Sequence, residues 1–118
     1  MLRVAIHTEG ESPKIVEFPY DQRVTFGRAD DNDIVLPPSY VSRQHGEFLF
    51  EEGAWWLIDR GSLTGMSITR PESERRHLPR GGREELSGGE AIEILHTLLR
   101  VEIKPIESLM PLEDDDWW

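Results

Sequence analysis

Three short clusters in this sequence contain side chains suited to holding an anion. They are Phe26-Gly27-Arg28, then Val41-Ser42-Arg43-Gln44-His45, then residues 59–65, which read Asp-Arg-Gly-Ser-Leu-Thr-Gly. A guanidinium donates several hydrogen bonds in one plane, a serine hydroxyl donates another, and glycine lets the backbone approach closely or take a positive φ. Each cluster has the pattern of a strand end, a turn and a new strand. Three such turns at one end of a β-sandwich could hold a phosphate without a metal or a nucleophile.

Length and composition indicate a single soluble domain. The chain has 118 residues, which is long enough to bury a core. It has no cysteine, which excludes thiolate zinc sites, cysteine nucleophiles and disulfides. No apolar run reaches membrane-spanning length, and the first residues lack the apolar stretch of a signal peptide. The net charge of −10 disfavours nucleic acid and anionic membranes as partners. We therefore expect a cytoplasmic protein.

Alternating apolar and polar residues predict a succession of short strands with glycine and proline between them. The expected strands are residues 2–7, 14–18, 23–26, 46–51, 55–59, 66–69, 91–95 and 99–103, with a brief apolar run at 34–36. Residues 70–85 are expected to form a long polar loop. Because no window has a helical period, the pattern predicts an all-β sandwich.

The clusters and their surroundings resemble the forkhead-associated (FHA) domain. The resemblance also includes Asn-Asp-Ile-Val-Leu at 32–36, Trp-Trp-Leu-Ile-Asp at 55–59 and Leu-Ser-Gly-Gly-Glu-Ala-Ile at 86–92, and it covers nearly all of residues 2–104. The glycine-arginine pair followed by serine-x-x-histidine is its most specific part. The resemblance implies a sandwich of about eleven strands over residues 1–104, which binds phosphothreonine peptides through loops at one end. We expect no enzymatic activity, cofactor or metal.

The resemblance also assigns roles to individual residues. It implies that Arg28, Ser42, Arg43, Leu63 and Thr64 face the phosphopeptide, and that the loops are supported by Gly27, His45 and Gly65. The family usually has Ser-Thr-Asn-Gly-Thr where this sequence has Ser62-Leu63-Thr64-Gly65-Met66. Leu63 has no side-chain donor, and Thr64 lacks the paired donor and acceptor of an amide. Two lost hydrogen bonds, each about 1–3 kcal/mol, would weaken binding roughly ten- to ten-thousand-fold if nothing compensates.

Several residues of these clusters have a second interpretation. Arg28 could be a surface arginine paired with Asp30 or Asp31, although Ser42 and Arg43 beside it favour the phosphate role. We interpret His45 as a buried imidazole that fixes the loops, because no acid–base partner accompanies it. Asp-Asp-Asn-Asp at 30–33 lacks the spacing of an EF-hand and is expected to be a solvated turn. One of the neighbours Trp55 and Trp56 must point into the core.

Residues 105–118 form an acidic segment that ends in two tryptophans. The acids suit a solubilising end, but the tryptophans are costly to leave in water. The pattern favours a docking motif for a basic groove with an apolar pocket on a second protein. The residues concerned are Asp114, Asp115, Asp116, Trp117 and Trp118.

Two classes of function remain. The first is a stand-alone bacterial adaptor that reads phosphothreonine in kinase signalling or in the regulation of a secretion system. The second is a phosphorylation-independent scaffold that uses the sheet faces or residues 105–118. An enzyme is disfavoured, because the motif positions supply no nucleophile, base and orienting group together.

Overall fold

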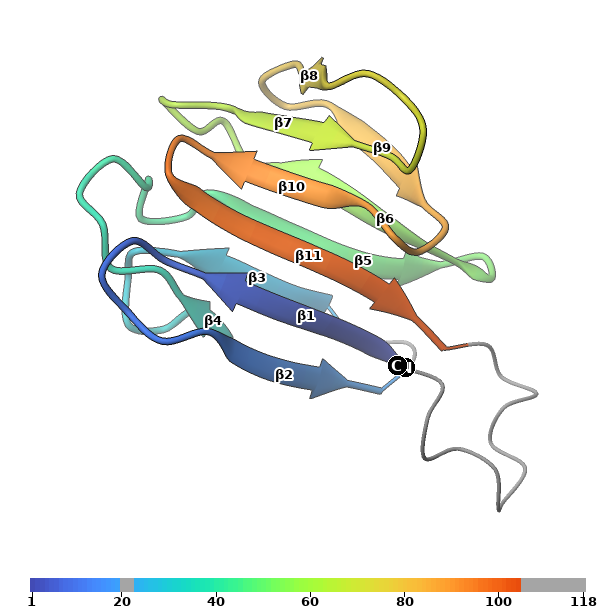
Figure 1. The fold of residues 1–118 in the computed structure, drawn as a ribbon, viewed down its shortest axis with the longest axis horizontal. Helices are drawn as coiled ribbons and strands as arrows, with labels where there is room; N and C mark the ends of the chain where they lie inside the picture. The colour runs from blue at the N-terminus through green and yellow to red at the C-terminus, as the bar shows by residue number, and fades with distance from the viewer. Residues whose placement is uncertain (20–22, 105–118) are drawn as a thin grey trace.

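The computed structural model describes residues 1–19 and 23–104, which form eleven strands and no helix (Figure 1). The all-β prediction is therefore confirmed. The predicted docking residues between Asp114 and Trp118 lie outside the described residues, so that prediction and the domain boundary at residue 104 stay predictions. The strands are β1 (Leu2–His7), β2 (Lys14–Phe18), β3 (Arg23–Gly27), β4 (Ile34–Val35), β5 (Gly46–Glu51), β6 (Ala54–Asp59), β7 (Met66–Thr69), β8 (Arg76–Leu78), β9 (Arg83–Leu86), β10 (Ala91–Ile94) and β11 (Thr97–Ile103).

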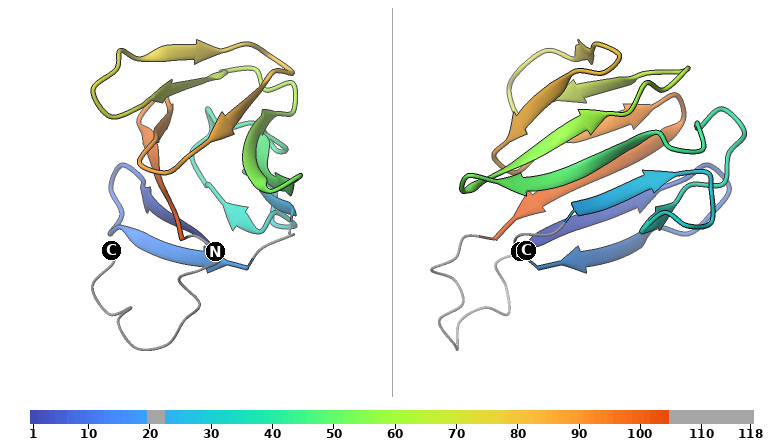
Figure 2. Two further views of the ribbon diagram at one scale, coloured as in Figure 1. Left: turned by 90° about the vertical axis from the view of Figure 1, so that its right-hand side faces the viewer. Right: turned by 180° about the vertical axis from the view of Figure 1, so that it is seen from behind.

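The strands form two sheets that face each other as the layers of a sandwich (Figure 2). The six-stranded sheet has the order β2-β1-β11-β10-β7-β8, and the five-stranded sheet has the order β4-β3-β5-β6-β9. The short β4 runs parallel to β3, while β3 and β5, and β5 and β6, pair antiparallel. The first and last strands, β1 and β11, are neighbours in the six-stranded sheet.

The core lies between the sheets and consists of alternate residues of the strands, because successive side chains of a strand point to opposite faces. Phe26 of β3 and Phe48 of β5 are fully buried, with ring centroids 5.1 Å apart. Trp55 is buried, whereas Trp56 is half-buried on the outer face under the guanidinium of Arg83, 4.3 Å from its ring centroid. One tryptophan of the pair therefore points inward, as predicted.

The prediction of one long polar loop over residues 70–85 is wrong. This segment contains β8 and the start of β9, which pair with β7 and β6. Both are edge strands, and within them only Leu78 and Leu86 are buried. An edge strand with one neighbour and one buried residue carries no alternation long enough to recognise.

The turns that concern function gather at one end of the sandwich. Figure 1 shows the β3–β4, β4–β5 and β6–β7 connections at this end, on the left, together with the β8–β9 and β10–β11 turns. Within residues 1–19 and 23–104, no helix has the length and apolarity needed to cross a membrane.

Candidate functional site

The β3–β4 and β4–β5 connections are joined by backbone hydrogen bonds just beyond the end of β3. The N–H of Arg28 donates to the carbonyl of Ser42 at 3.0 Å, and the N–H of Ala29 donates to the carbonyl of Arg43 at 3.3 Å. The side-chain amide of the buried Asn32 donates to the carbonyls of Ala29 and Arg43 at 2.9 and 2.8 Å. The two connections therefore act as one unit, which places the backbones of Arg28, Ser42 and Arg43 beside one another.

Gly27 is required at this junction for space. A Cβ at this position would lie 2.2 Å from the carbonyl oxygen of Arg43, which no real contact tolerates. A glycine can be required for a positive φ or for a close approach of the backbone. Gly27 does not have a positive φ, so the close approach is the reason here. Gly65 differs, since its φ of 81° lies in the left-handed region that favours glycine.

His45 connects the second cluster to the third. Its imidazole is fully buried, and Nδ1 accepts a hydrogen bond from the N–H of Ser42 at 3.1 Å. Nε2 must then carry the proton, and it donates to the carbonyl of Gly65 at 3.1 Å. Burial lowers the pKa of His45, despite the opposing effects of the Gly65 carbonyl and of Asp59. The histidine is therefore held neutral, with both ring nitrogens committed to loop backbone.

The turn after β6 is built on Asp59 and Ser62, whose role sequence reasoning did not identify. Oδ1 of Asp59 accepts the N–H groups of Gly61 and Ser62 at 2.7 and 2.9 Å, and Oδ2 accepts the Ser62 hydroxyl at 2.7 Å. Burial alone would raise the pKa of Asp59, but these bonds hold it below its ordinary value. The signal was available: an aspartate two residues before a glycine is typical of a side chain that closes its own turn.

Ser42 and Leu63 meet where the clusters converge. The N–H of Leu63 donates to Oγ of Ser42 at 3.0 Å, which leaves the hydroxyl proton of Ser42 free to donate to a ligand. The side chain of Leu63 is 83% exposed. At this position, where the family pattern has a donor, an apolar group therefore projects into solvent beside the Ser42 hydroxyl.

The hydroxyl of Thr64 is already engaged within the protein. Oγ1 donates to the carbonyl of Tyr40 in the β4–β5 connection, and the Thr64 side chain is half-buried. Thr64 therefore links two loops and has no proton left to donate to a peptide carbonyl.

Arg28 and Arg43 are exposed at the same convergence. Nε of Arg28 donates to the carbonyl of Val41 at 2.9 Å, which leaves the Nη groups for other partners. Among residues 1–19 and 23–104, no carboxylate forms an ion pair with Arg28 or Arg43. The alternative pairing of Arg28 with Asp30 or Asp31 is therefore not observed. Asp31 instead accepts from the side chain of Gln44 at 3.2 Å.

Together these groups can bind a tetrahedral oxyanion. The exposed Arg28 and Arg43 and the hydroxyl of Ser42 belong to loops whose backbones are fixed by His45, Asn32 and Asp59. The described part of the chain contains no cluster of His, Asp and Glu side chains able to hold a metal ion. Sequence reasoning also missed Arg80, whose Nε donates to the carbonyl of Ser62 at 3.1 Å. No motif marks this arginine, because its position depends on the pairing of β9 with β6.

Comparison with known proteins agrees with this architecture. The FHA domain family model matches residues 24–94, which include each residue discussed at the convergence. The oxoglutarate dehydrogenase inhibitor of Corynebacterium diphtheriae is 37% identical over 70 residues, which are 59% of this chain and 43% of that protein. The glycogen accumulation regulator GarA of Mycolicibacterium smegmatis is also 37% identical over 70 residues, 58% of this chain and 44% of that protein. The chain thus aligns with less than half the length of these curated relatives.

Solved structures match over most of the chain. The FHA domain of CT664 protein from Chlamydia trachomatis superposes with a TM-score of 0.72 at 18% identity, covering 87% of this chain and 97% of that one. The FHA domain of an Arabidopsis thaliana hypothetical protein gives a TM-score of 0.75 at 20% identity, covering 95% and 89%. A structure from work on phosphothreonine-dependent FHA domain interactions gives 0.65 at 21% identity, covering 88% and 99%. At these identities the likeness establishes the fold.

Proposed function

Because this chain belongs to the FHA domain family, we propose that it binds a phosphothreonine-containing segment of a partner protein at the convergence of its loops. Membership of this family also confirms the prediction that the chain is a binding module rather than an enzyme. The phosphate would contact Arg28, Arg43 and the hydroxyl of Ser42. One solved structure of the same fold comes from work on phosphothreonine-dependent FHA domain interactions, which supports the choice of ligand.

One observation carries the proposal: within residues 1–19 and 23–104, neither Arg28 nor Arg43 forms an ion pair, although the chain is strongly acidic. The sequence has 23 acidic and 13 basic residues, so carboxylates are abundant as partners for any arginine. Both arginines are exposed, have no ion-pair partner among the described residues, and lie on loops that hydrogen bonds fix in place. Their positive charge is the sign needed to bind a dianionic phosphate. A planar guanidinium suits phosphate better than a lysine would.

Binding of one synthetic phosphothreonine peptide series tests the proposal. A degenerate library with phosphothreonine at its centre first selects a sequence, and calorimetry then compares the selected peptide with its unphosphorylated form. We expect the wild type to bind the phosphorylated peptide only. Equal binding of both forms would instead support the phosphorylation-independent scaffold.

Arg28→Ala should abolish measurable binding of the phosphopeptide. A hydrogen-bonded charge pair that loses one partner costs about 2–5 kcal/mol, which is roughly thirty- to several-thousand-fold in affinity. Arg100→Ala is the matched control, since Arg100 is also exposed and lies on β11 opposite Ala5 and Ala91. Full affinity in the Arg28 variant would contradict the assignment of the site.

The biological role that fits is a regulatory adaptor in bacterial signalling or secretion, acting in the cytoplasm. The relatives from Corynebacterium diphtheriae and Mycolicibacterium smegmatis are named as an inhibitor and a regulator, which supports a regulatory role. The altered pair Leu63 and Thr64 would make the binding weaker than the family pattern allows. The partner's sequence around the phosphothreonine would then matter more for affinity.

Residues 105–118 are proposed to add a second protein contact. The acidic run that ends in Trp117 and Trp118 has the composition of a docking motif. Deleting residues 112–118 should remove a pulled-down partner or raise phosphopeptide affinity modestly, and higher salt should shrink the second effect because it is electrostatic. A deletion that changes neither would make this segment a solubilising end.

A further inference from the structure

The arginines of this domain divide into two groups by their partners. Ion pairs within the domain engage Arg3, Arg23, Arg60, Arg70, Arg75, Arg76 and Arg83. Over residues 1–19 and 23–104, the arginines without a carboxylate partner are Arg28, Arg43, Arg80 and Arg100. Arg28 and Arg43 belong to the proposed phosphate site, so the distribution raises the question of what Arg80 binds.

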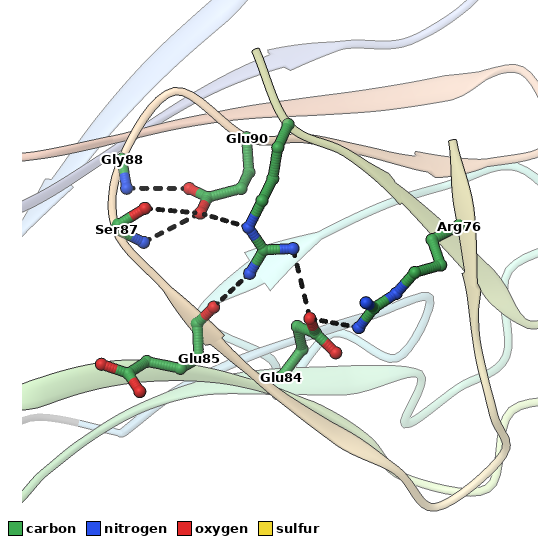
Figure 3. A network of polar contacts seen from close by, with 7 residues as sticks. Arg76, Glu84, Glu85, Ser87, Gly88 and Glu90 are labelled. Carbon is green, nitrogen blue, oxygen red and sulfur yellow. Dashed lines mark hydrogen bonds and ion pairs between the residues drawn. The ribbon is translucent and has the colours of Figure 1, made fainter. Parts of the chain in front are cut away.

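Residues 70–83 contain five arginines, and ion pairs in the folded protein neutralise most of their positive charge. Figure 3 shows part of the reason: Arg76 lies beside Glu84 of β9, and Glu90 of the β9–β10 turn belongs to the same network of polar contacts. Arg70 lies 3.2 Å from Glu84 and 3.6 Å from the buried Glu90, and Arg76 also pairs with Glu84. Arg75 pairs with Glu93 at 3.0 Å. Of the arginines in this segment, only Arg80 forms no ion pair among the described residues.

Arg80 is presented by a tight turn at the functional end. The N–H of Gly82 donates to the carbonyl of Pro79 at 2.8 Å, and Gly81 has a φ of 76°, which together define a type II turn with Arg80 at its second position. The N–H of Gly81 also points at Oδ1 of Asp59, at 3.4 Å. The turn is therefore tied to the buried aspartate that organises residues 59–65.

The side chain of Arg80 reaches the edge of the phosphate site. Its Nε donates to the carbonyl of Ser62 at 3.1 Å, and the N–H of the same peptide group, from Leu63, donates to Oγ of Ser42 at 3.0 Å. One peptide group thus separates the guanidinium from the Ser42 hydroxyl, so the two lie within about 8 Å of each other. The side chain of Arg80 is exposed, and its Nη groups form no hydrogen bond or ion pair with the part of the chain that the structure describes.

We propose that Arg80 binds a second acidic side chain of the ligand, two or three residues from the phosphothreonine. This inference rests on the proposed function. The peptide group between Ser62 and Leu63 keeps Arg80 away from the phosphate itself, whereas an extended ligand advances about 3.3 Å per residue and brings a neighbouring side chain within reach. Arg80 is then a specificity-determining residue, which selects acidic sequences around the phosphothreonine.

The test uses phosphothreonine peptides of one background sequence, with glutamate or glutamine placed in turn at each of the positions up to three residues on either side. We expect glutamate at one position two or three residues away to raise wild-type affinity about three- to fivefold over glutamine. Arg80→Ala should remove this preference while the glutamine peptide binds as before. Arg100→Ala, the matched control, should keep the preference.

The outcomes separate this inference from the proposed function. A wild type that binds no phosphopeptide contradicts the proposed function, and this role of Arg80 with it. A wild type that binds the phosphopeptides but shows no preference for glutamate contradicts the role of Arg80 alone, and so does an Arg80→Ala variant that keeps the preference. If Arg80→Ala lowers the affinity for the glutamate and glutamine peptides equally, the proposed role is also overturned, and Arg80 instead supports the conformation of residues 60–65.

Discussion

The N–H of Leu63 and the hydroxyl oxygen of Ser42 form a hydrogen bond of 3.0 Å that joins the β6–β7 connection to the β4–β5 connection. The bond uses the backbone of Leu63, so it does not depend on which side chain stands at this position. The exposed leucine can therefore be exchanged without uncoupling the loops. This separates the effect of the side chain on ligand binding from its effect on the fold.

Restoring the family pattern should strengthen phosphopeptide binding. The double change Leu63→Thr with Thr64→Asn adds a hydroxyl donor beside Ser42 and an amide that offers both a donor and an acceptor. We expect affinity to rise at least about fivefold, which corresponds to one further net hydrogen bond of about 1 kcal/mol. Calorimetry with the selected phosphopeptide measures the change.

The single variants show which position carries the gain. Leu63→Thr alone should leave the melting temperature unchanged, because the side chain is exposed. Thr64→Asn replaces the hydroxyl that holds the carbonyl of Tyr40, so its amide must take over that bond before any is left for the ligand. No gain in any of the three variants would mean that these positions do not face the peptide.

His45→Ala should destabilise the fold. In the wild type, the fully buried imidazole joins the N–H of Ser42 to the carbonyl of Gly65. The variant leaves both backbone groups without this hydrogen-bond partner. Unpaired groups of this kind cost about 1–3 kcal/mol, and urea unfolding measures the loss. A variant of full stability that has lost phosphopeptide binding would make His45 a direct ligand contact instead.

Stability should fall in two separate steps as the pH is lowered. The pKa of His45 is lowered in the fold, so the unfolded chain takes up a proton more readily, and stability present above the ordinary value of 6.5 is lost as the pH falls from there towards the lowered pKa. The pKa of Asp59 is lowered too, so its contribution is present above the ordinary value of 3.8 and is lost as the pH falls below it.

Urea midpoints measured across this range distinguish the two groups. The step that begins near 6.5 should be reduced in His45→Ala, and the step below 3.8 should be reduced in Asp59→Asn. An unchanged upper step in the histidine variant would show that other groups cause it.

Gly27→Ala should be strongly destabilising although it adds a single methyl group. The new Cβ would lie 2.2 Å from the carbonyl oxygen of Arg43 and 2.9 Å from the backbone nitrogen of His45, so the β3 and β4–β5 segments must separate. Forced overpacking typically costs about 1–3 kcal/mol. Because the separation moves Arg28 away from Ser42, phosphopeptide affinity should fall as well. A variant with the wild-type melting temperature would show that the loops can move apart at no cost.

Local patterns in the sequence were sufficient to predict most of the fold. Alternation places residues such as Leu2, Val4 and Ile6 on one face of a strand, and each is buried. The chemical type and spacing of Arg28, Ser42 and His45 likewise predict that they belong to one phosphate-binding site, because turns that follow strands can meet at one end of a sandwich. These features depend on near neighbours in the chain, and a sequence records near neighbours directly.

Other features depend on which distant segments pair, and the sequence does not record that. Edge strands β8 and β9 have too few buried residues to produce an alternating pattern, so the sequence predicts a loop there. When these strands pair with β7 and β6, Glu84 and Glu90 come to lie beside Arg70. Their carboxylates neutralise positive charge in a segment that is basic in the sequence. The same pairing places Arg80 beside Ser62, with no ion-pair partner among the residues that the structure describes. Which charges stay available to a ligand is therefore decided by sheet register, because an ion pair forms only between side chains that the folded backbone brings within a few ångströms.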